Sequence, residues 1–137
     1  MLKSGAYLSI LDYNHELLTW NPEPPASMKT FYEAFLKWRS DTGMNNRIAE
    51  DLADYFNHAG FIDIEVINSD ENYEKGQENF LSRIGIWSKV AKLNQVVEEG
   101  YISEELRMNA IVEYDEWIAR YAMRMTMKLK EVRGRKI

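Results

Sequence analysis

The 137-residue sequence contains no cysteine, only two histidines and only three prolines, which all lie between positions 22 and 25. The lack of cysteine excludes disulfides and cysteine-ligated zinc or iron–sulfur sites, and two histidines leave little material for a histidine-rich metal site. No apolar run approaches the roughly 20 residues of a membrane span, and the N-terminal residues lack the pattern of a signal peptide. We therefore expect a cytoplasmic protein with no metal site and no membrane segment.

Glycine and positive charge are also scarce. The seven glycines are too far apart to form a G-x-G loop, in which glycine lets the backbone approach a bound cofactor. The net charge of −5 argues against general binding to nucleic acid, which favours a basic protein. No Ser-His-Asp, Cys-His or paired-carboxylate set and no P-loop is recognisable, so the common hydrolase and nucleotide-triphosphate mechanisms have no candidate residues.

What is present is typical of a folded globular protein, with 45 % hydrophobic and 28 % charged residues. The length is that of one ordinary domain, and no repeat, low-complexity segment or linker divides it. We therefore expect residues 1–137 to form a single domain.

The spacing of apolar residues predicts an α/β pattern. Strands are expected at 6–13, 61–67 and 123–130, and helices at 27–42, 46–59, 77–98 and 104–121, with Ser27 and Ser103 as helix N-caps. Residues 14–25 are expected to form an extended, proline-rich loop, and residues 68–76 an acidic loop. A sheet of only three strands would leave an unpaired edge.

Several of these segments follow a known order. The sequence LKSGAYLSILD at residues 2–12 has a glycine-containing turn before a strand, and GFIDI at 60–64 opens a second strand after the helix at 46–60. Together with the alternating segment 123–133, they resemble the second half of class I S-adenosylmethionine-dependent methyltransferases. In that family the turn usually reads Pro-Gly-Gly, whereas this sequence has Ser4-Gly5-Ala6.

The resemblance implies a partial Rossmann-like sheet, with equivalents of the family's strands 5, 7 and 6, and a helical insertion at about 77–121. The family's cofactor motifs all lie in its first half. The resemblance therefore implies S-adenosylmethionine as the cofactor of the complete domain, and no cofactor-binding residue in this chain. We expect the C-terminal, acceptor-side part of such a methyltransferase, inactive alone; the alternative is a non-catalytic, self-associating interaction module.

Candidate residues for a small-molecule acceptor are Asp12, Tyr13, Asn14 and His15, which lie at the C-terminal end of the first predicted strand. In open α/β sheets ligands bind beyond the carboxyl ends of strands, and one of these side chains could orient an acceptor or take its proton. The alternative is structural: Asp12 and Asn14 would make turn hydrogen bonds, and His15 would lie on the surface.

Two aromatic residues of the first predicted helix, Tyr32 and Trp38, are further candidates. With Trp20 and Phe35 they could form the wall of an apolar acceptor pocket. Aromatic residues at helical spacing more often pack in a core, and this alternative stays open.

The first predicted strand also raises the question of a partner. Its segment Ala6–Asp12 would lie at a sheet edge and must be covered. We expect either a homodimer, in which two such strands pair about a two-fold axis, or pairing with a missing N-terminal half.

Overall fold

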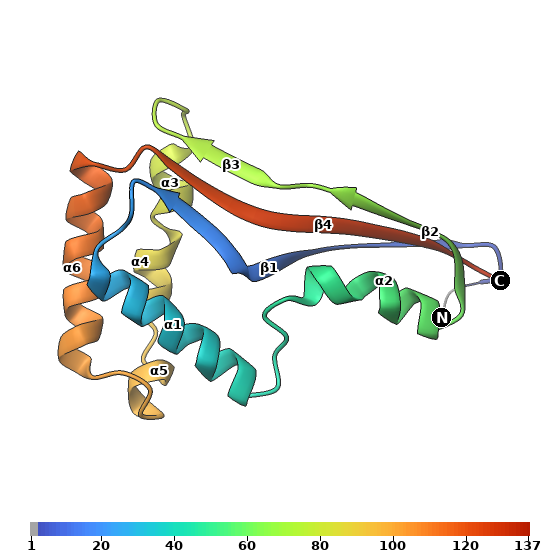
Figure 1. The fold of residues 1–137 in the computed structure, drawn as a ribbon, viewed down its shortest axis with the longest axis horizontal. Coiled ribbons are helices and arrows are strands. Elements are labelled where there is room, and N and C mark those ends of the chain that lie inside the picture. Colours follow the sequence, from blue (N-terminus) through green and yellow to red (C-terminus); the bar gives the residue numbers. More distant parts are fainter. Residues whose placement is uncertain (1–2) are drawn as a thin grey trace. The chain divides into compact units, whose positions relative to one another are not determined.

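The structure is a computed structural model that describes residues 3–137, so Leu2 of the turn motif lies outside it. The fold is mixed α/β with a four-stranded antiparallel sheet (Figure 1). The strands are β1 (Tyr7–Asn21), β2 (Phe61–Asn68), β3 (Glu71–Glu74) and β4 (Arg124–Lys136). The helices are α1 (Ala26–Asp41), α2 (Ile48–His58), α3 (Phe80–Ile84), α4 (Ile86–Ala91), α5 (Gln95–Glu98) and α6 (Glu104–Arg120).

The strand order is β1–β4–β2, and β3 also pairs with β4. β4 runs antiparallel to β2, with Phe61 opposite Lys136 and Asn68 opposite Lys130. The last strand of the chain therefore lies between two earlier ones. The short strand β3 was not predicted, because residues 68–76 read as a polar loop.

The chain divides into two compact units, and β1 and β4 contribute to both. The first unit comprises the residues up to Leu18, Asn45–Glu71 and Met127–Ile137. The second comprises Thr19–Met44 and Asn72–Thr126.

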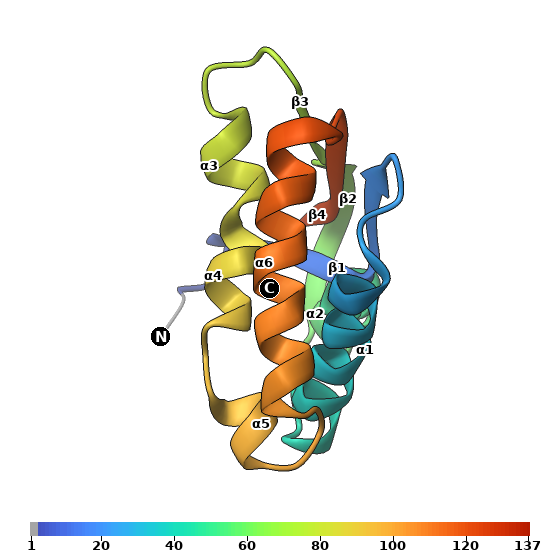
Figure 2. The same ribbon diagram turned by 90° about the vertical axis from the view of Figure 1, so that its left-hand side faces the viewer.

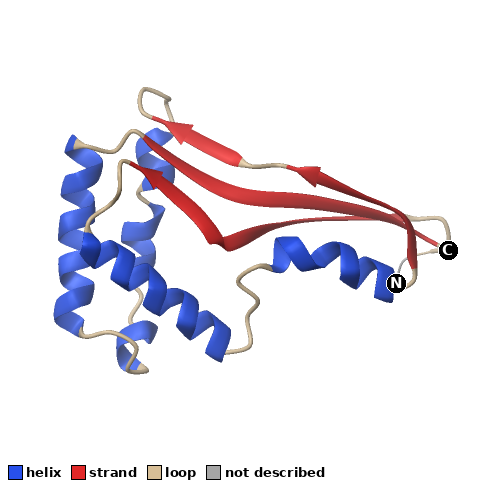
Figure 3. Ribbon diagram, viewed as in Figure 1, coloured by secondary structure: helices blue, strands red, loops and turns tan. Residues whose placement is uncertain are grey.

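In the first unit, α2 covers one face of the sheet formed by β1, β4 and β2 (Figure 3). Ile48, Leu52 and Phe56 recur at a spacing of four, so they form one apolar stripe on the helix. Leu52 and Phe56 are buried together with Val132, and Leu8 and Ile10 pack around them. These contacts fix the side of the sheet on which α2 lies.

In the second unit, α1, α4 and α6 lie side by side around an aromatic core (Figure 2). The buried rings of this core are Phe31, Tyr32, Phe35, Trp87, Tyr114 and Trp117. Tyr114 is fully buried, and its hydroxyl accepts a hydrogen bond from Trp20 Nε1 at 2.9 Å and donates one to the Ile84 carbonyl at 2.7 Å. A buried tyrosine of this kind keeps its polar end satisfied while its ring packs.

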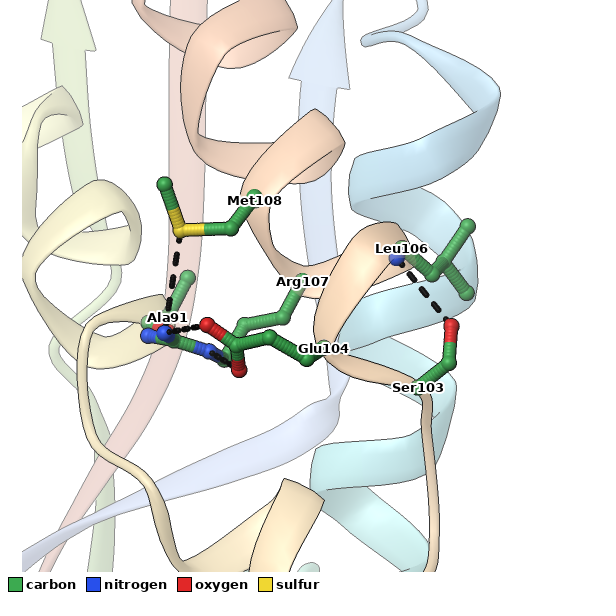
Figure 4. A network of polar contacts seen from close by, with 6 residues as sticks. All are labelled: Ala91, Ser103, Glu104, Leu106, Arg107 and Met108. Atoms are coloured by element: carbon green, nitrogen blue, oxygen red, sulfur yellow. Dashed lines mark hydrogen bonds and ion pairs between the residues drawn. The ribbon is translucent and has the colours of Figure 1, made fainter.

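A buried arginine ties α6 to α4 (Figure 4). Arg107 is 8 % exposed; its Nη1 donates to the Ala91 carbonyl at 3.0 Å, and its Nε donates to Glu104 at 2.9 Å. The ion pair with Glu104 raises the pKa of Arg107 and lowers that of the glutamate. Nearby, the Ser103 hydroxyl accepts from the Leu106 amide, which confirms the predicted N-cap of this helix.

Three expectations about the helices and strands were wrong in detail. Helix α1 follows Pro25 instead of a Ser27 cap, and the buried Ser27 hydroxyl finds no hydrogen-bond partner among residues 3–137. The helix predicted at 77–98 is broken into α3, α4 and α5, with Gly85 at the first joint. The proline-rich loop is shorter than expected, because β1 continues to Asn21.

No helix within residues 3–137 combines the length and the apolar character needed to cross a membrane.

Candidate functional site

The residues Asp12, Tyr13, Asn14 and His15 lie in the middle of β1, not at its end. The expected position beyond the carboxyl end of the strand was therefore wrong. The strand continues because its second part joins the start of β4, where the Met123 amide donates to the Asn21 carbonyl at 2.9 Å. Side chains alternate between the two faces of a strand, so these four residues separate into two pairs.

On the face covered by α2, Asn14 is 5 % exposed and lies at the centre of a polar network. Its Nδ2 donates to Glu50 Oε1 at 3.3 Å, and its Oδ1 accepts from the Glu16 amide at 3.1 Å. The ammonium group of Lys130 contacts the other oxygen of Glu50 at 2.5 Å. Each oxygen of the Glu50 carboxylate is therefore held by a donor from a different strand.

This arrangement keeps Glu50 ionised. The hydrogen bond from Lys130 lowers the pKa of Glu50, partial burial opposes that effect, and the hydrogen bond from Asn14 lowers the pKa further. A carboxylate that accepts bonds from an ammonium and an amide favours its charged form. At neutral pH the network therefore presents an anion beside a cation.

A hollow of about 240 Å³ lies beside this network. Its lining residues are Leu17, Glu50, Asn68, Asp70, Lys128, Leu129 and Lys130. Lys128 and Asp70 form a second ion pair at 3.0 Å, and Asp70 also accepts from the Leu129 amide at 3.2 Å. A small molecule here would meet both cationic donors and carboxylate acceptors, which suits a polar ligand better than an apolar one.

On the opposite face of β1, the rings of Tyr13 and His15 stack at 5.6 Å between centroids. The Tyr13 hydroxyl donates to Glu71 at 3.2 Å, and the His15 amide donates to the Asn46 carbonyl at 2.7 Å. Asp12 accepts from the adjacent Tyr13 amide at 2.7 Å, a local bond of the kind that the structural alternative expects. The structure thus brings Asn14 together with Glu50, and Tyr13 together with His15, on different faces.

Tyr32 and Trp38 belong to the second unit. Tyr32 is 7 % exposed and meets Trp20 and Trp87 edge to face, at 5.6 and 5.0 Å between ring centroids. Burial raises the pKa of Tyr32. Trp38 stacks on Phe35, and its Nε1 donates to Glu99 at 2.6 Å. This geometry matches the core-packing interpretation of Tyr32, while the role of both residues in a site stays a prediction.

Sequence reasoning missed Glu50 and Lys130. Glu50 reads as a polar position of an amphipathic helix and Lys130 as a polar position of an alternating strand. The two are 80 residues apart, so no local spacing links them. Only the packing of α2 against the sheet brings their charges together.

Residues 3–137 contain no group of three His, Cys, Asp or Glu side chains placed to hold a metal ion. Gly85 and Gly134 are the glycines whose missing Cβ leaves room for close neighbours, and those neighbours are the chain's own Leu81 carbonyl and Phe56 ring. These two glycines make room for packing inside the protein.

No protein-family model and no curated protein matches the chain. Among solved structures, the chain is similar to phosphoethanolamine N-methyltransferase 2 of Haemonchus contortus, in complex with phosphomonomethylethanolamine and S-adenosylhomocysteine. The identity is 16 % and the TM-score 0.37, and the match covers 98 % of this chain. The chain spans 27 % of the length of that protein.

Proposed function

We propose that the chain is the acceptor-side part of an S-adenosylmethionine-dependent methyltransferase, and that it depends on a separate cofactor-binding part for activity. The observation that carries the proposal is the strand order β1–β4–β2. Both outer strands are antiparallel to β4, so they run parallel to each other and are linked through α1 and α2. This is the arrangement expected of the family's strands 5, 7 and 6.

This order is a more specific feature than fold class alone. Strands that are neighbours in the sequence are usually neighbours in a sheet, whereas here the final strand lies between two earlier ones. The turn LKSGA precedes β1, and the segment GFIDI opens β2. The resemblance of these two motifs to the family supports the proposal.

Within the proposed function, the network of Asn14, Glu50 and Lys130 binds and orients the acceptor. The Glu50 carboxylate would accept a hydrogen bond from an amine or hydroxyl group, and Lys130 would donate to an anionic or carbonyl group. Glu50 suits orientation better than proton removal, because a lowered pKa makes its carboxylate a weak base.

The test is to produce one fused protein, in which the segment encoded directly upstream is joined to the 137-residue chain. We expect the joined protein to bind S-adenosylhomocysteine with a micromolar or tighter dissociation constant, and the 137-residue chain alone to give no heat in the same titration. A joined protein that binds no cofactor, or cofactor binding by the 137-residue chain alone, would contradict the proposal.

The joined protein also tests the site. Transfer of radiolabelled methyl groups would be measured on a panel of small amines, alcohols and carboxylates. The variant Glu50→Gln should lower transfer by about tenfold or more while cofactor affinity stays unchanged. Glu113→Gln, at an exposed position of α6, is the matched control and should retain full transfer.

A second function, that of a non-catalytic, self-associating module, is favoured by one observation. The outer edge of β1 carries outward backbone amides and carbonyls with which a second copy of the chain can form hydrogen bonds.

A further inference from the structure

The two edges of the sheet in the first unit differ in how they resist pairing with another chain. At the β2 edge, the register shifts between Ile62 and Glu65, and Asp63 has a positive φ of 53°. Bulges and charged residues at an edge strand interrupt the row of backbone groups that another strand would need. The β2 edge is therefore protected.

At the β1 edge, the hydrogen bonds to β4 set which backbone groups point outward. The Gly5 amide donates to the Lys136 carbonyl at 2.7 Å, and the Lys136 amide donates to the Ala6 carbonyl at 2.8 Å. Backbone groups alternate in direction along an antiparallel strand, so Ala6 points toward β4 and Tyr7, Ser9 and Leu11 point away from it. The sheet has no strand on that side within residues 3–137.

Two contacts close this open stretch at its far end. The next outward amide, that of Tyr13, donates to the carboxylate of Asp12 at 2.7 Å. The one after it, that of His15, donates to the Asn46 carbonyl at 2.7 Å. The side chains of Ile10 and Asn14 both lie on the face of β1 that α2 covers. The alternation of outward and inward backbone groups therefore continues without a bulge between these two residues. The open edge therefore runs from Tyr7 to Leu11.

The side chains of this stretch lack the features that discourage pairing. The sequence YLSIL contains no charge and no proline. Tyr7 is 69 % exposed and Leu11 57 % exposed, while Leu8 and Ile10 are partly buried against the core under α2.

We propose that a second copy of this chain pairs antiparallel with the β1 edge, about a two-fold axis at Ser9. In this register Ser9 lies opposite Ser9 of the second copy, and Tyr7 lies opposite its Leu11. Every outward amide and carbonyl of Tyr7, Ser9 and Leu11 then has a partner on the other copy. Leu8 faces Ile10 of the other copy on the α2 side, so the pairs on that face are aliphatic.

The neighbouring registers satisfy fewer groups. One of them places Tyr7 opposite Tyr13, whose amide is already bonded to Asp12. The other places Leu11 opposite Gly5, whose amide is already bonded to Lys136. The bonds inside one copy therefore select the register centred on Ser9. This inference depends on the β1 edge alone and not on the proposed methyltransferase function.

Light scattering and sedimentation at about 50 µM test the association. We expect a mass of about 32 kDa, twice the 16.1 kDa of one chain. Leu11→Lys, at an exposed position of the β1 edge, should weaken the dimer by at least about tenfold. Val66→Lys makes the same change at a 51 % exposed position of the protected β2 edge and should leave the dimer intact.

Cross-linking tests the register, since the natural sequence has no cysteine. Directly opposite residues of a hydrogen-bonded pair have Cα atoms about 5.5 Å apart, within the range of about 4.4 to 6.8 Å that a disulfide spans. Ser9→Cys should therefore form a covalent dimer when oxidised glutathione is added. Tyr7→Cys should not, because the two introduced thiols would lie about 13 Å apart along the strands.

A monomer mass at 50 µM, equal cross-linking of both cysteine variants, or loss of the dimer in Val66→Lys but not in Leu11→Lys would overturn the proposal. If the β1 edge instead pairs with a separate cofactor-binding part, the 137-residue chain alone would have a monomer mass at 50 µM. None of the measurements involves a cofactor or an acceptor, so a failed dimer would leave the proposed function untouched.

Discussion

Lys130 of β4 and Glu50 of α2, 80 residues apart in the chain, form a hydrogen-bonded ion pair on the face of the sheet that α2 covers. Their side chains are 29 % and 24 % exposed, so water screens the pair only in part. The buried amide of Asn14 holds the second oxygen of Glu50. This pair both fastens α2 to the sheet and forms the centre of the candidate acceptor site.

The first prediction concerns the stability that this pair contributes. Glu50→Gln removes the charge but keeps the shape, and it should lower the free energy of unfolding by about 1 kcal/mol at pH 7. Urea denaturation checks the value. A double-mutant cycle with Lys130→Gln should show that the two losses are not additive, whereas Glu113→Gln should have no effect.

The same variant predicts a pH dependence. The folded state holds the pKa of Glu50 below its ordinary value of 4.5, so its contribution is present above pH 4.5 and is lost as the pH falls through the folded pKa. The difference in stability between the natural protein and Glu50→Gln should therefore be constant from pH 5 to 7 and shrink below about pH 4.5. A difference that grew in acid would contradict this assignment.

The second prediction concerns the packing of β4 against α2. A Cβ at Gly134 would lie 2.7 Å from Phe56 Cδ2 and 3.1 Å from Phe61 Cβ. Gly134→Ala should therefore destabilise the protein by about 1–3 kcal/mol through overpacking. In the background of Phe56→Leu, which removes the contacting ring, the same substitution should cost clearly less, and thermal unfolding of the four proteins measures this. Equal costs in both backgrounds would exclude the steric explanation.

The third prediction concerns the aromatic core of the second unit. Tyr114→Phe leaves the Ile84 carbonyl and the Trp20 indole without the hydroxyl that joins them. Unpaired buried polar groups should cost about 1–3 kcal/mol in unfolding experiments. Tyr121→Phe, at a 61 % exposed position, removes a hydroxyl from the surface and should change stability little. Similar losses in both variants would show that the buried bonds contribute nothing specific.

Helices and strands whose boundaries are marked by nearby residues were predictable from the sequence. Ser103 followed by two glutamates and an apolar stripe marks the start of α6, and its cap is present. Gly60 and the alternation after it mark the start of β2. In these segments apolar residues recur at the period of the helix or strand, because one face of each element must be buried.

Segments that depend on distant partners were harder to predict. Residues 14–21 contain polar side chains and precede the prolines, so they read as a loop, yet they form a strand because β4 lies beside them. Residues 71–74 are acidic, and they become β3 for the same reason. The break at Gly85 also has no clear local signal, since the apolar period continues through it.

The candidate site also combines a residue that could be named from the sequence with partners that could not. Asn14 was named from its place after a predicted strand, but its partners Glu50 and Lys130 carry no sequence signal of their own. Tyr32 and Trp38 were named as an aromatic group, and the structure shows which rings surround them.

The amino-acid sequence by itself determined the α/β class, the buried faces of the main helices and the absence of a glycine-rich loop, because these depend on residues that are close along the chain. The tertiary structure alone decided the ion pair of Glu50 with Lys130, the continuation of β1 to Asn21, and the pairing of β3 with β4. Each of these features depends on contacts between segments that lie far apart in the sequence. Backbone hydrogen bonds and charges select such partners only once the chain has folded.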